Sequence, residues 1–339
     1  MASPQPPYPL HPSVATKLDT VYVSFYNAHI FDKQQVHYQP VAASRTSGVL
    51  IPGGGPKLPV ASTEDILIAR TETEGPDVAV RVFTPEGEKP EAGWPVMIYY
   101  HGGGWVLGNI DTENTVCTNL CSRAACVVIT VDYRLAPENP YPAAVHDSWE
   151  ALVWVFRTGG ARLGLDLSKA AVGGSSAGGN LAAIMCHKLL THPPAGLAVA
   201  PKFLVQLLIV PVTDNTAAAA TQPSWAENEF TAALPALKML WYRKHYLPLE
   251  SSWSEPEASP LLYPSGWAEQ PPALIVVGEL DVLRSEGEAY AQKLESAGVP
   301  VDLKIMKGMP HPFLAMDAVL QQGRDTITFM VEKLKAAFA

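Results

Sequence analysis

A glycine–serine turn between a small apolar strand and a helix constrains this chain more than any other feature. Gly174, Ser176 and Gly178 stand in the order G-x-S-x-G, after the apolar residues 170–172 and before the helix-forming residues 181–185. Such a strand–turn–helix is typical of a nucleophile elbow, in which a strained turn lifts a serine hydroxyl above a sheet. The two glycines let the backbone fold tightly under the serine. The pattern therefore predicts a nucleophilic serine at position 176.

The same turn allows two other interpretations. Ser175 is the neighbouring serine, but the residue two places after it is Ala177 rather than glycine, so the register favours Ser176. A glycine-rich turn before a helix can also bind phosphate. However, no lysine follows in the spacing of a phosphate-binding loop, and no G-x-G-x-x-G pattern fits this stretch.

The motif His101-Gly102-Gly103-Gly104 follows an apolar and aromatic run that predicts a buried strand. Acyl transfer develops negative charge on an oxygen, and this charge needs backbone N–H donors that are already aimed at it. We therefore expect the amides of Gly103, Gly104 and Ala177 to form an oxyanion hole. His101 and Gly102 are expected to support this turn rather than to act as acid or base. A flexible turn after a strand is the alternative.

A general base must take the proton of the serine, and in this arrangement it follows the serine in the chain. Four histidines do so: His187, His192, His245 and His311. The first two lie on or at the end of the helix that the serine begins, and the third lies in an aromatic-rich helical stretch. His311 follows the expected strand 300–306 and a turn, which suits a catalytic histidine. We therefore expect His311 to be the base.

The acid that orients this histidine is expected after the apolar run 273–278, which indicates a buried parallel strand. Asp281 stands at the carboxyl end of this run, directly before a helix, and Glu279 is the second candidate. We predict Asp281 as the orienting acid. For either carboxylate, capping the start of the following helix is the alternative role.

The apolar runs predict eight strands and an α/β class of fold. A hairpin near 64–84 comes first, and strict alternation of strands and helices follows. This alternation implies right-handed crossovers and a mostly parallel sheet with helices on both faces. Ligands then bind beyond the carboxyl ends of the strands, where all the candidate catalytic residues lie. The later strands are expected near 95–101, 126–131, 169–174, 203–211, 272–278 and 300–306, and the helices near 111–124, 143–159, 177–190, 284–297 and 314–338.

Two segments do not fit this alternation: residues 1–63, with an expected helix near 13–31, and residues 212–271. The second segment is rich in leucine and aromatic residues. We expect the two segments to form a cap over the site, where they would exclude water and line an apolar pocket. Core packing of a helical insert is the alternative. The catalytic domain then consists of residues 64–211 and 272–339.

Composition excludes several classes of protein. The 339 residues carry a formal net charge of −9 without a basic block, so nucleic acid is not an expected partner. The four cysteines lack the C-x-x-C spacing of a zinc site, and we expect buried free thiols in a reducing compartment. The start of the chain lacks a signal-peptide pattern, and no run is long and apolar enough to span a membrane. We expect a soluble, cytoplasmic protein.

Four separated blocks in the same order resemble the hormone-sensitive lipase family of α/β-hydrolases. They are residues 101–104, 132–138, 174–179 and the pair of Asp281 with His311. The resemblance covers about residues 64–338 and implies an α/β-hydrolase fold with a helical cap. It also implies a serine carboxylesterase that acts on small-molecule esters with short to medium acyl chains and uses no cofactor or metal. The same resemblance allows a homodimer, and by analogy Asp132 and Arg134 would buttress the glycine loop.

The chain departs from this family at Ser175, where an aspartate is usual, and this leaves substrate preference open. Plant hormone receptors of similar sequence have lost the catalytic histidine, whereas His311 is present, which favours chemistry over ligand sensing. The expected reaction is attack of Ser176 on an ester carbonyl, with His311 as base, Asp281 as its partner and an acyl-enzyme intermediate. A biosynthetic acyltransferase, lactonase, amidase or dehydratase is the alternative on the same machinery. A ligand-binding receptor is the alternative from another class.

Overall fold

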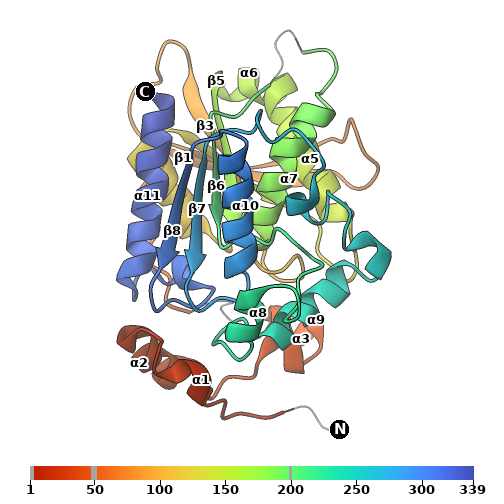
Figure 1. The fold of residues 1–339 in the computed structure, drawn as a ribbon. Coiled ribbons are helices and arrows are strands. Elements are labelled where there is room, and N and C mark those ends of the chain that lie inside the picture. Colours follow the sequence, from red (N-terminus) through yellow and green to blue (C-terminus); the bar gives the residue numbers. More distant parts are fainter. Residues whose placement is uncertain (1–3, 47–51, 198–200) are drawn as a thin grey trace.

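The computed structural model describes residues 4–46, 52–197 and 201–339. At its centre lies one eight-stranded sheet with the strand order β1-β2-β4-β3-β5-β6-β7-β8 (Figure 1). β2 is antiparallel to both β1 and β4, and every other neighbouring pair is parallel. The strands are β1 (Ser62–Ile68), β2 (Val78–Thr84), β3 (Trp94–Tyr100), β4 (Val127–Asp132), β5 (Leu165–Ser175), β6 (Val205–Ile209), β7 (Ala273–Gly278) and β8 (Val301–Met306). The predicted α/β class, with an antiparallel start and a mostly parallel sheet, is confirmed.

Both faces of the sheet are buried because its strands carry apolar residues almost without interruption. In β3, Val96 and Ile98 belong to one hydrophobic core, whereas Met97 and Tyr99 belong to the other. Successive side chains of a strand point to opposite faces, so one apolar run serves two cores. The first core includes residues of α5 (Ala143–Trp154), α7 (Ala177–Thr191) and α10 (Arg284–Ser296), and the second includes residues of α4 (Asn114–Ala124) and α11 (Gln321–Phe338). Figure 1 shows α10 and α11 on opposite sides of the sheet.

Helix boundaries differ from the sequence-based expectation at two places. The expected helix near 13–31 is divided into α1 (Pro12–Ala15) and α2 (Thr20–His29), because the carboxylate of Asp19 accepts the backbone N–H of Val21 at 2.8 Å and caps the second helix. The expected helix near 314–338 begins only with α11. A separate 3₁₀ turn, η5 (Phe313–Met316), precedes it.

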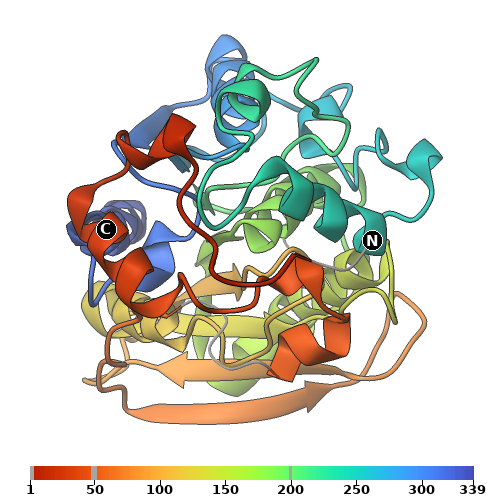
Figure 2. The ribbon, with the colours of Figure 1, turned by 90° about the horizontal axis from the view of Figure 1, so that it is seen from below.

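Helices of the N-terminal segment and of residues 212–271 lie beyond the carboxyl ends of the parallel strands. Figure 1 shows α1, α2, α8 (Pro223–Glu227) and α9 (Ala236–Tyr246) at the end toward which β7 and β8 point, and Figure 2 shows them from below. Both segments line one cavity there. The remaining helical elements of the described residues are η1 (Val36–Tyr38), α3 (Val41–Thr46), the π-helical turn η2 (Val155–Gly159), α6 (Gly160–Leu163), η3 (Glu250–Ser252) and η4 (Pro260–Leu262).

The four cysteines are buried free thiols, as predicted: Cys117, Cys121, Cys126 and Cys186. Among the helices of the described residues, none combines the length and the apolar character needed to cross a bilayer.

Candidate active site

Ser176 lies in a strained turn between β5 and α7. Its backbone has φ 54° and ψ −116°, and a positive φ is uncommon for a residue with a side chain. The turn packs tightly against the end of β3. A Cβ atom at Gly178 would lie 1.9 Å from the carbonyl oxygen of Tyr100, and one at Gly174 would lie 2.3 Å from the same atom. Both positions therefore require glycine if the serine is to keep this place.

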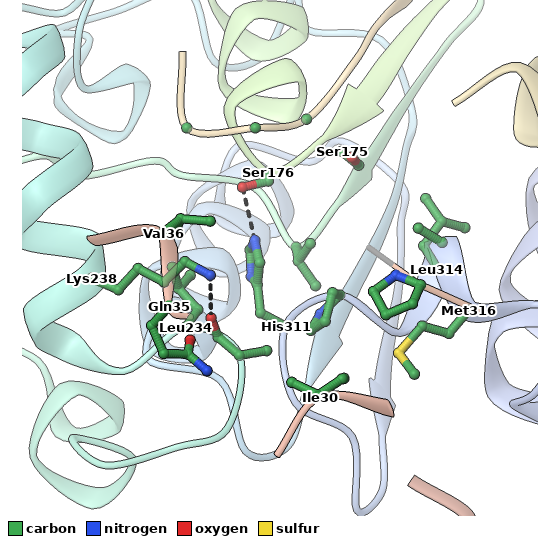
Figure 3. Close-up of a pocket in the computed structure, with 18 of the residues that line it drawn as sticks. Ile30, Gln35, Val36, Ser175, Ser176, Leu234, Lys238, His311, Leu314 and Met316 are labelled. Atoms are coloured by element: carbon green, nitrogen blue, oxygen red, sulfur yellow. Dashed lines mark hydrogen bonds between the residues drawn. The ribbon is translucent and has the colours of Figure 1, made fainter. Parts of the chain in front are cut away.

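His311 joins Ser176 to Asp281 through two hydrogen bonds. Its Nε2 atom lies 2.8 Å from Ser176 Oγ, and its Nδ1 atom lies 2.7 Å from Asp281 Oδ2 (Figure 3). Asp281 is 1% exposed, and its second oxygen accepts the backbone N–H of Leu283 at 3.0 Å, at the start of α10. The three residues follow β5, β7 and β8, so the parallel sheet brings them together at one edge.

The alternative acid and bases lie elsewhere. Glu279 pairs with Lys307 at 2.8 Å, on the surface. His187 is buried in α7, where its ring stacks on Tyr263 with centroids 4.1 Å apart. Its Nε2 atom lies 3.2 Å from the hydroxyl of Tyr290, so this imidazole is a satisfied core residue.

The glycine loop after β3 lines the cavity and leaves two of its amides without a hydrogen-bond acceptor among the described residues. Gly103 has φ +124° and Gly104 has φ +61°, both in the region that favours glycine. Within the described parts of the chain, no hydrogen bond uses either amide as a donor. Both glycines line the cavity that also contains Ser176 and His311. The sequence-predicted donors therefore stand beside the serine, and Ala177 follows it at the first position of α7.

His101 stabilises the glycine loop through its contacts with Tyr133 and Gly102. Its ring stacks on Tyr133 with centroids 4.3 Å apart, and its Nδ1 atom lies 2.7 Å from the carbonyl oxygen of Gly102. The hydroxyl of Tyr133 donates to the carbonyl oxygen of His101 at 2.8 Å. Burial lowers the pKa of His101 to about 4, so the ring is neutral at physiological pH.

The expectation that Arg134 buttresses the glycine loop is wrong. Its guanidinium group pairs with Asp147 at 2.9 Å, and it makes no hydrogen bond to residues 101–104. The neighbouring residue Tyr133 has the buttressing contact instead. Burial raises the pKa of the other residue expected there, Asp132, which stands at the end of β4.

A cavity of about 650 Å³ opens over the serine. The glycine loop forms one wall, and residues from the N-terminal elements and from α9 form the others. Apolar side chains of three segments line it: Ile30, Val36, Leu234, Met239, Leu314 and Met316 (Figure 3). Among the described residues, no cluster of three or more histidine, cysteine or acidic side chains could hold a metal ion.

Sequence reasoning missed several polar residues of this cavity, and two of them, Glu113 and Lys238, bear on its chemistry. Glu113 is 7% exposed, and its Oε1 atom accepts a hydrogen bond from the hydroxyl of Ser175, the residue before Ser176. Lys238, on α9, reaches the cavity from the opposite wall. Neither stands in a motif, because a single glutamate before a helix and a single lysine within one are ordinary surface patterns. Only the folded chain places them beside Ser176.

Comparison with known proteins agrees with this architecture. Residues 97–315 match the family described as alpha/beta hydrolase fold. An AB hydrolase superfamily protein of Schizosaccharomyces pombe is 51% identical over 336 residues, which cover 98% of this chain and 97% of that protein. The ethyl acetate hydrolase of Pseudomonas putida is 34% identical over 268 residues, which cover 79% of this chain and 81% of that enzyme. The crystal structure of a thermostable esterase from Pseudomonas putida ECU1011 has a TM-score of 0.81 at 29% identity, and the match covers 95% of this chain and 98% of the esterase.

The chain therefore belongs to the α/β-hydrolase fold family, in its group of esterases similar to hormone-sensitive lipase, and it is a carboxylic ester hydrolase.

Proposed function

We propose that this chain is a serine carboxylesterase in which Ser176, His311 and Asp281 form a catalytic triad. The observation that supports this proposal most is the continuous chain of hydrogen bonds from Asp281 through His311 to Ser176, with heavy-atom distances of 2.7 and 2.8 Å. The proposed nucleophile, base and orienting acid lie in the order that acyl transfer needs, and each lies within hydrogen-bond distance of the next. The strained backbone of Ser176 is a second support, because strain of this kind is typical of nucleophile elbows.

In the proposed reaction, Ser176 Oγ attacks the ester carbonyl carbon while His311 Nε2 takes the hydroxyl proton. Asp281 accepts the Nδ1–H of His311, which fixes the tautomer and stabilises the imidazolium. The imidazolium then gives its proton to the leaving alcohol oxygen, and the carbon–oxygen bond of the ester breaks. Water attacks the acyl-enzyme by the reverse sequence of proton transfers, and the carboxylic acid leaves.

The proposed oxyanion hole consists of the amides of Gly103, Gly104 and Ala177. The first two have no acceptor among the described residues, so they are available to a developing negative charge. His101, Gly102, Gly174 and Gly178 support this arrangement through the close contacts described above. Donors that are aimed before the substrate arrives need no reorganisation during the reaction.

We also propose that residues 1–63 and 212–271 form a cap over a catalytic domain of residues 64–211 and 272–339. Residues of both segments line the cavity beside Ser176, as a cap requires. A cavity of about 650 Å³ whose lining includes Ile30, Val36, Leu234, Met239, Leu314 and Met316 suits esters with short to medium acyl chains. The relative named ethyl acetate hydrolase agrees with the short end of this range.

The test combines a substrate panel with covalent labelling. We expect the enzyme to hydrolyse neutral esters with acyl chains from acetyl to octanoyl. Its kcat/KM should decline toward the dodecanoyl ester. Ser176→Ala should lower kcat by roughly 10⁴–10⁶-fold and abolish labelling by a fluorophosphonate probe. Ser175→Ala is the matched control and should still be labelled. Near-normal turnover by Ser176→Ala, or labelling lost only in Ser175→Ala, would refute the assignment of the nucleophile.

A further inference from the structure

The cavity beside Ser176 contains a group that hydrolysis of a neutral ester does not use, the ammonium group of Lys238. This residue stands in the first turn of α9, and Figure 3 shows its side chain reaching into the same cavity as Ser176 and His311. Gln35, from the N-terminal segment, lines the same cavity. A cation in the first turn of a helix is unfavourable, because the helix dipole is positive there. A lysine at position 238 therefore destabilises the start of α9, and helix formation does not explain why it stands there.

Within the described residues, the ammonium group is incompletely paired. It donates one hydrogen bond there, to the carbonyl oxygen of Ala233 at 2.7 Å, although an ammonium has three N–H donors. No carboxylate in residues 4–46, 52–197 or 201–339 forms an ion pair with it. Burial lowers the pKa of Lys238 to about 8, so the group is protonated at neutral pH. Lys238 is half-buried, and a partly desolvated charge without a counterion is stabilised when a partner arrives.

The surroundings of Lys238 offer no compensating negative charge. Of the described residues that line the cavity, Glu113 alone is acidic, and it accepts the hydroxyl of Ser175 behind the glycine loop. Lys33 and His29 line the cavity as well and share the sign of Lys238 when they are protonated. His37 is close enough for Lys238 to lower its pKa, which burial chiefly brings to about 4, so this ring is neutral. Among the described residues, the lining therefore offers Lys238 no carboxylate other than Glu113, which the hydroxyl of Ser175 already engages.

We propose that Lys238 binds a carboxylate carried by the substrate, so that this enzyme prefers anionic esters such as the half-esters of dicarboxylic acids. This inference rests on the proposed esterase function and narrows its substrate class. The carboxylate would accept hydrogen bonds from the unused N–H groups of the ammonium, and the side-chain amide of Gln35, which lines the same cavity, would be a second donor. Hydrolysis would then release an alcohol and a dicarboxylate, by the same bond changes as for a neutral ester.

A structural role is the competing explanation for Lys238. Ala233 has a positive φ of 66°, and the ammonium caps its carbonyl oxygen, so loss of the lysine could disturb this turn. Such a disturbance would lower the turnover of every ester. A substrate-binding role would lower the turnover of anionic esters selectively. The ratio of kcat/KM for an anionic ester to that for a neutral ester of the same shape separates the two.

The experiment measures this ratio for monoethyl succinate, glutarate and adipate, each against its neutral carboxamide counterpart. A second arm places the charge in the alcohol half, with 4-acetoxybutanoate against 4-acetoxybutanamide. We expect the wild-type enzyme to prefer the carboxylate in at least one pair. Lys238→Met should lower that ratio by roughly 10- to 100-fold, as expected for a hydrogen bond to a charged group. Lys238→Arg should retain most of the preference.

Lys244→Met is the matched control, because it removes the same charge from an exposed position of the same helix. Its ratio should stay within about twofold of the wild-type value. The inference is overturned if the wild-type enzyme prefers the carboxamides in every pair, or if Lys238→Met lowers both rates equally. Both results leave the esterase proposal intact, because that proposal fails only if the neutral esters are not hydrolysed through Ser176.

Discussion

The hydroxyl group of Ser175 donates a hydrogen bond to the Oε1 atom of Glu113, 62 positions earlier in the chain. This contact lies directly behind the glycine loop, since a Cβ atom at Gly102 would be 2.7 Å from Ser175 Oγ and 3.4 Å from Glu113 Oε1. Burial raises the pKa of Glu113, whereas the hydrogen bond from Ser175 opposes that shift. Ser175 therefore couples a buried acid to the position of the glycine loop, in which we propose the oxyanion hole.

Ser175→Ala should destabilise the protein and slow the reaction. The variant removes a hydrogen-bond donor from a buried carboxyl group, and the expected cost is about 1–3 kcal/mol. The loop should then be held less firmly, so kcat should fall while KM changes little. Denaturant unfolding and steady-state kinetics measure the two effects. Ser175→Thr, which keeps the hydroxyl, should restore both, and an unaltered Ser175→Ala enzyme would show that the contact is dispensable.

Gly178→Ala should destabilise the protein through a steric clash alone. Its added methyl group would lie 1.9 Å from the carbonyl oxygen of Tyr100, and we expect a loss of about 3 kcal/mol or more, with little activity left. Gly87→Ala is the contrasting variant, because it meets no atom within 4 Å but has φ +106°. Only conformational strain acts there, so the loss should be roughly 1 kcal/mol. Equal losses in thermal or denaturant unfolding would contradict this account.

Arg243 holds the segment 212–271 together from within. It is 2% exposed, and its guanidinium carbon lies 5.0 Å from the ring centre of Trp225 and 5.1 Å from that of Trp253. One N–H donates to the carbonyl oxygen of Ala217 at 2.9 Å. Stacking of a desolvated guanidinium on two indoles is stabilising, and its loss also leaves a cavity.

We therefore expect Arg243→Ala to lower the free energy of unfolding by roughly 2–5 kcal/mol and to speed proteolysis within residues 212–271. Arg243→Met fills the same space and should cost less. The neighbouring exposed variant Lys244→Ala should stay within about 0.5 kcal/mol of the wild-type protein. If Arg243→Ala unfolds like the Lys244→Ala control, the stacking contributes nothing to this segment.

The fold and the candidate triad could be predicted because their signals are local. Ser176 stands in a five-residue pattern, and Asp281 and His311 each follow an apolar strand directly. Once the strands are known to be parallel, the edge at which these residues meet follows from topology. The division of the expected helix near 13–31 also had a local signal, the N-cap residue Asp19.

The polar partners of the site had no such signal. Glu113 meets Ser175, and Lys238 meets the cavity, only because distant segments pack together. For Arg134 the sequence predicted a contact that the structure does not have. The family resemblance led us to expect that Arg134 supports the glycine loop, whereas Tyr133 makes that contact. Side-chain partners depend on packing across tens or hundreds of positions, and periodicity along the chain does not record them.

Glu286 should make stability depend on pH. Its carboxyl group is fully buried in α10 and accepts the backbone N–H of Thr213 at 2.8 Å and the indole N–H of Trp225 at 3.3 Å. Burial raises its pKa to about 8, above the ordinary value of 4.5. The folded protein therefore keeps a proton that the unfolded chain releases between about pH 4.5 and 8. In that window the free energy of unfolding must fall as pH rises, by up to about 1.4 kcal/mol per pH unit.

Glu286→Gln removes this titration but keeps an acceptor for Thr213, while the bond from Trp225 is lost. The variant should be less stable than the wild-type protein at pH 5, and the difference should shrink or reverse by pH 8.5. Urea unfolding of both proteins, in steps of half a pH unit, measures the difference between their free energies of unfolding. The contributions of the other titrating groups largely cancel in this difference. A difference that stays constant from pH 5 to 8.5 would mean that Glu286 is ionised in the folded protein throughout. In that case Arg243 and the surrounding amides, rather than a bound proton, would neutralise its charge.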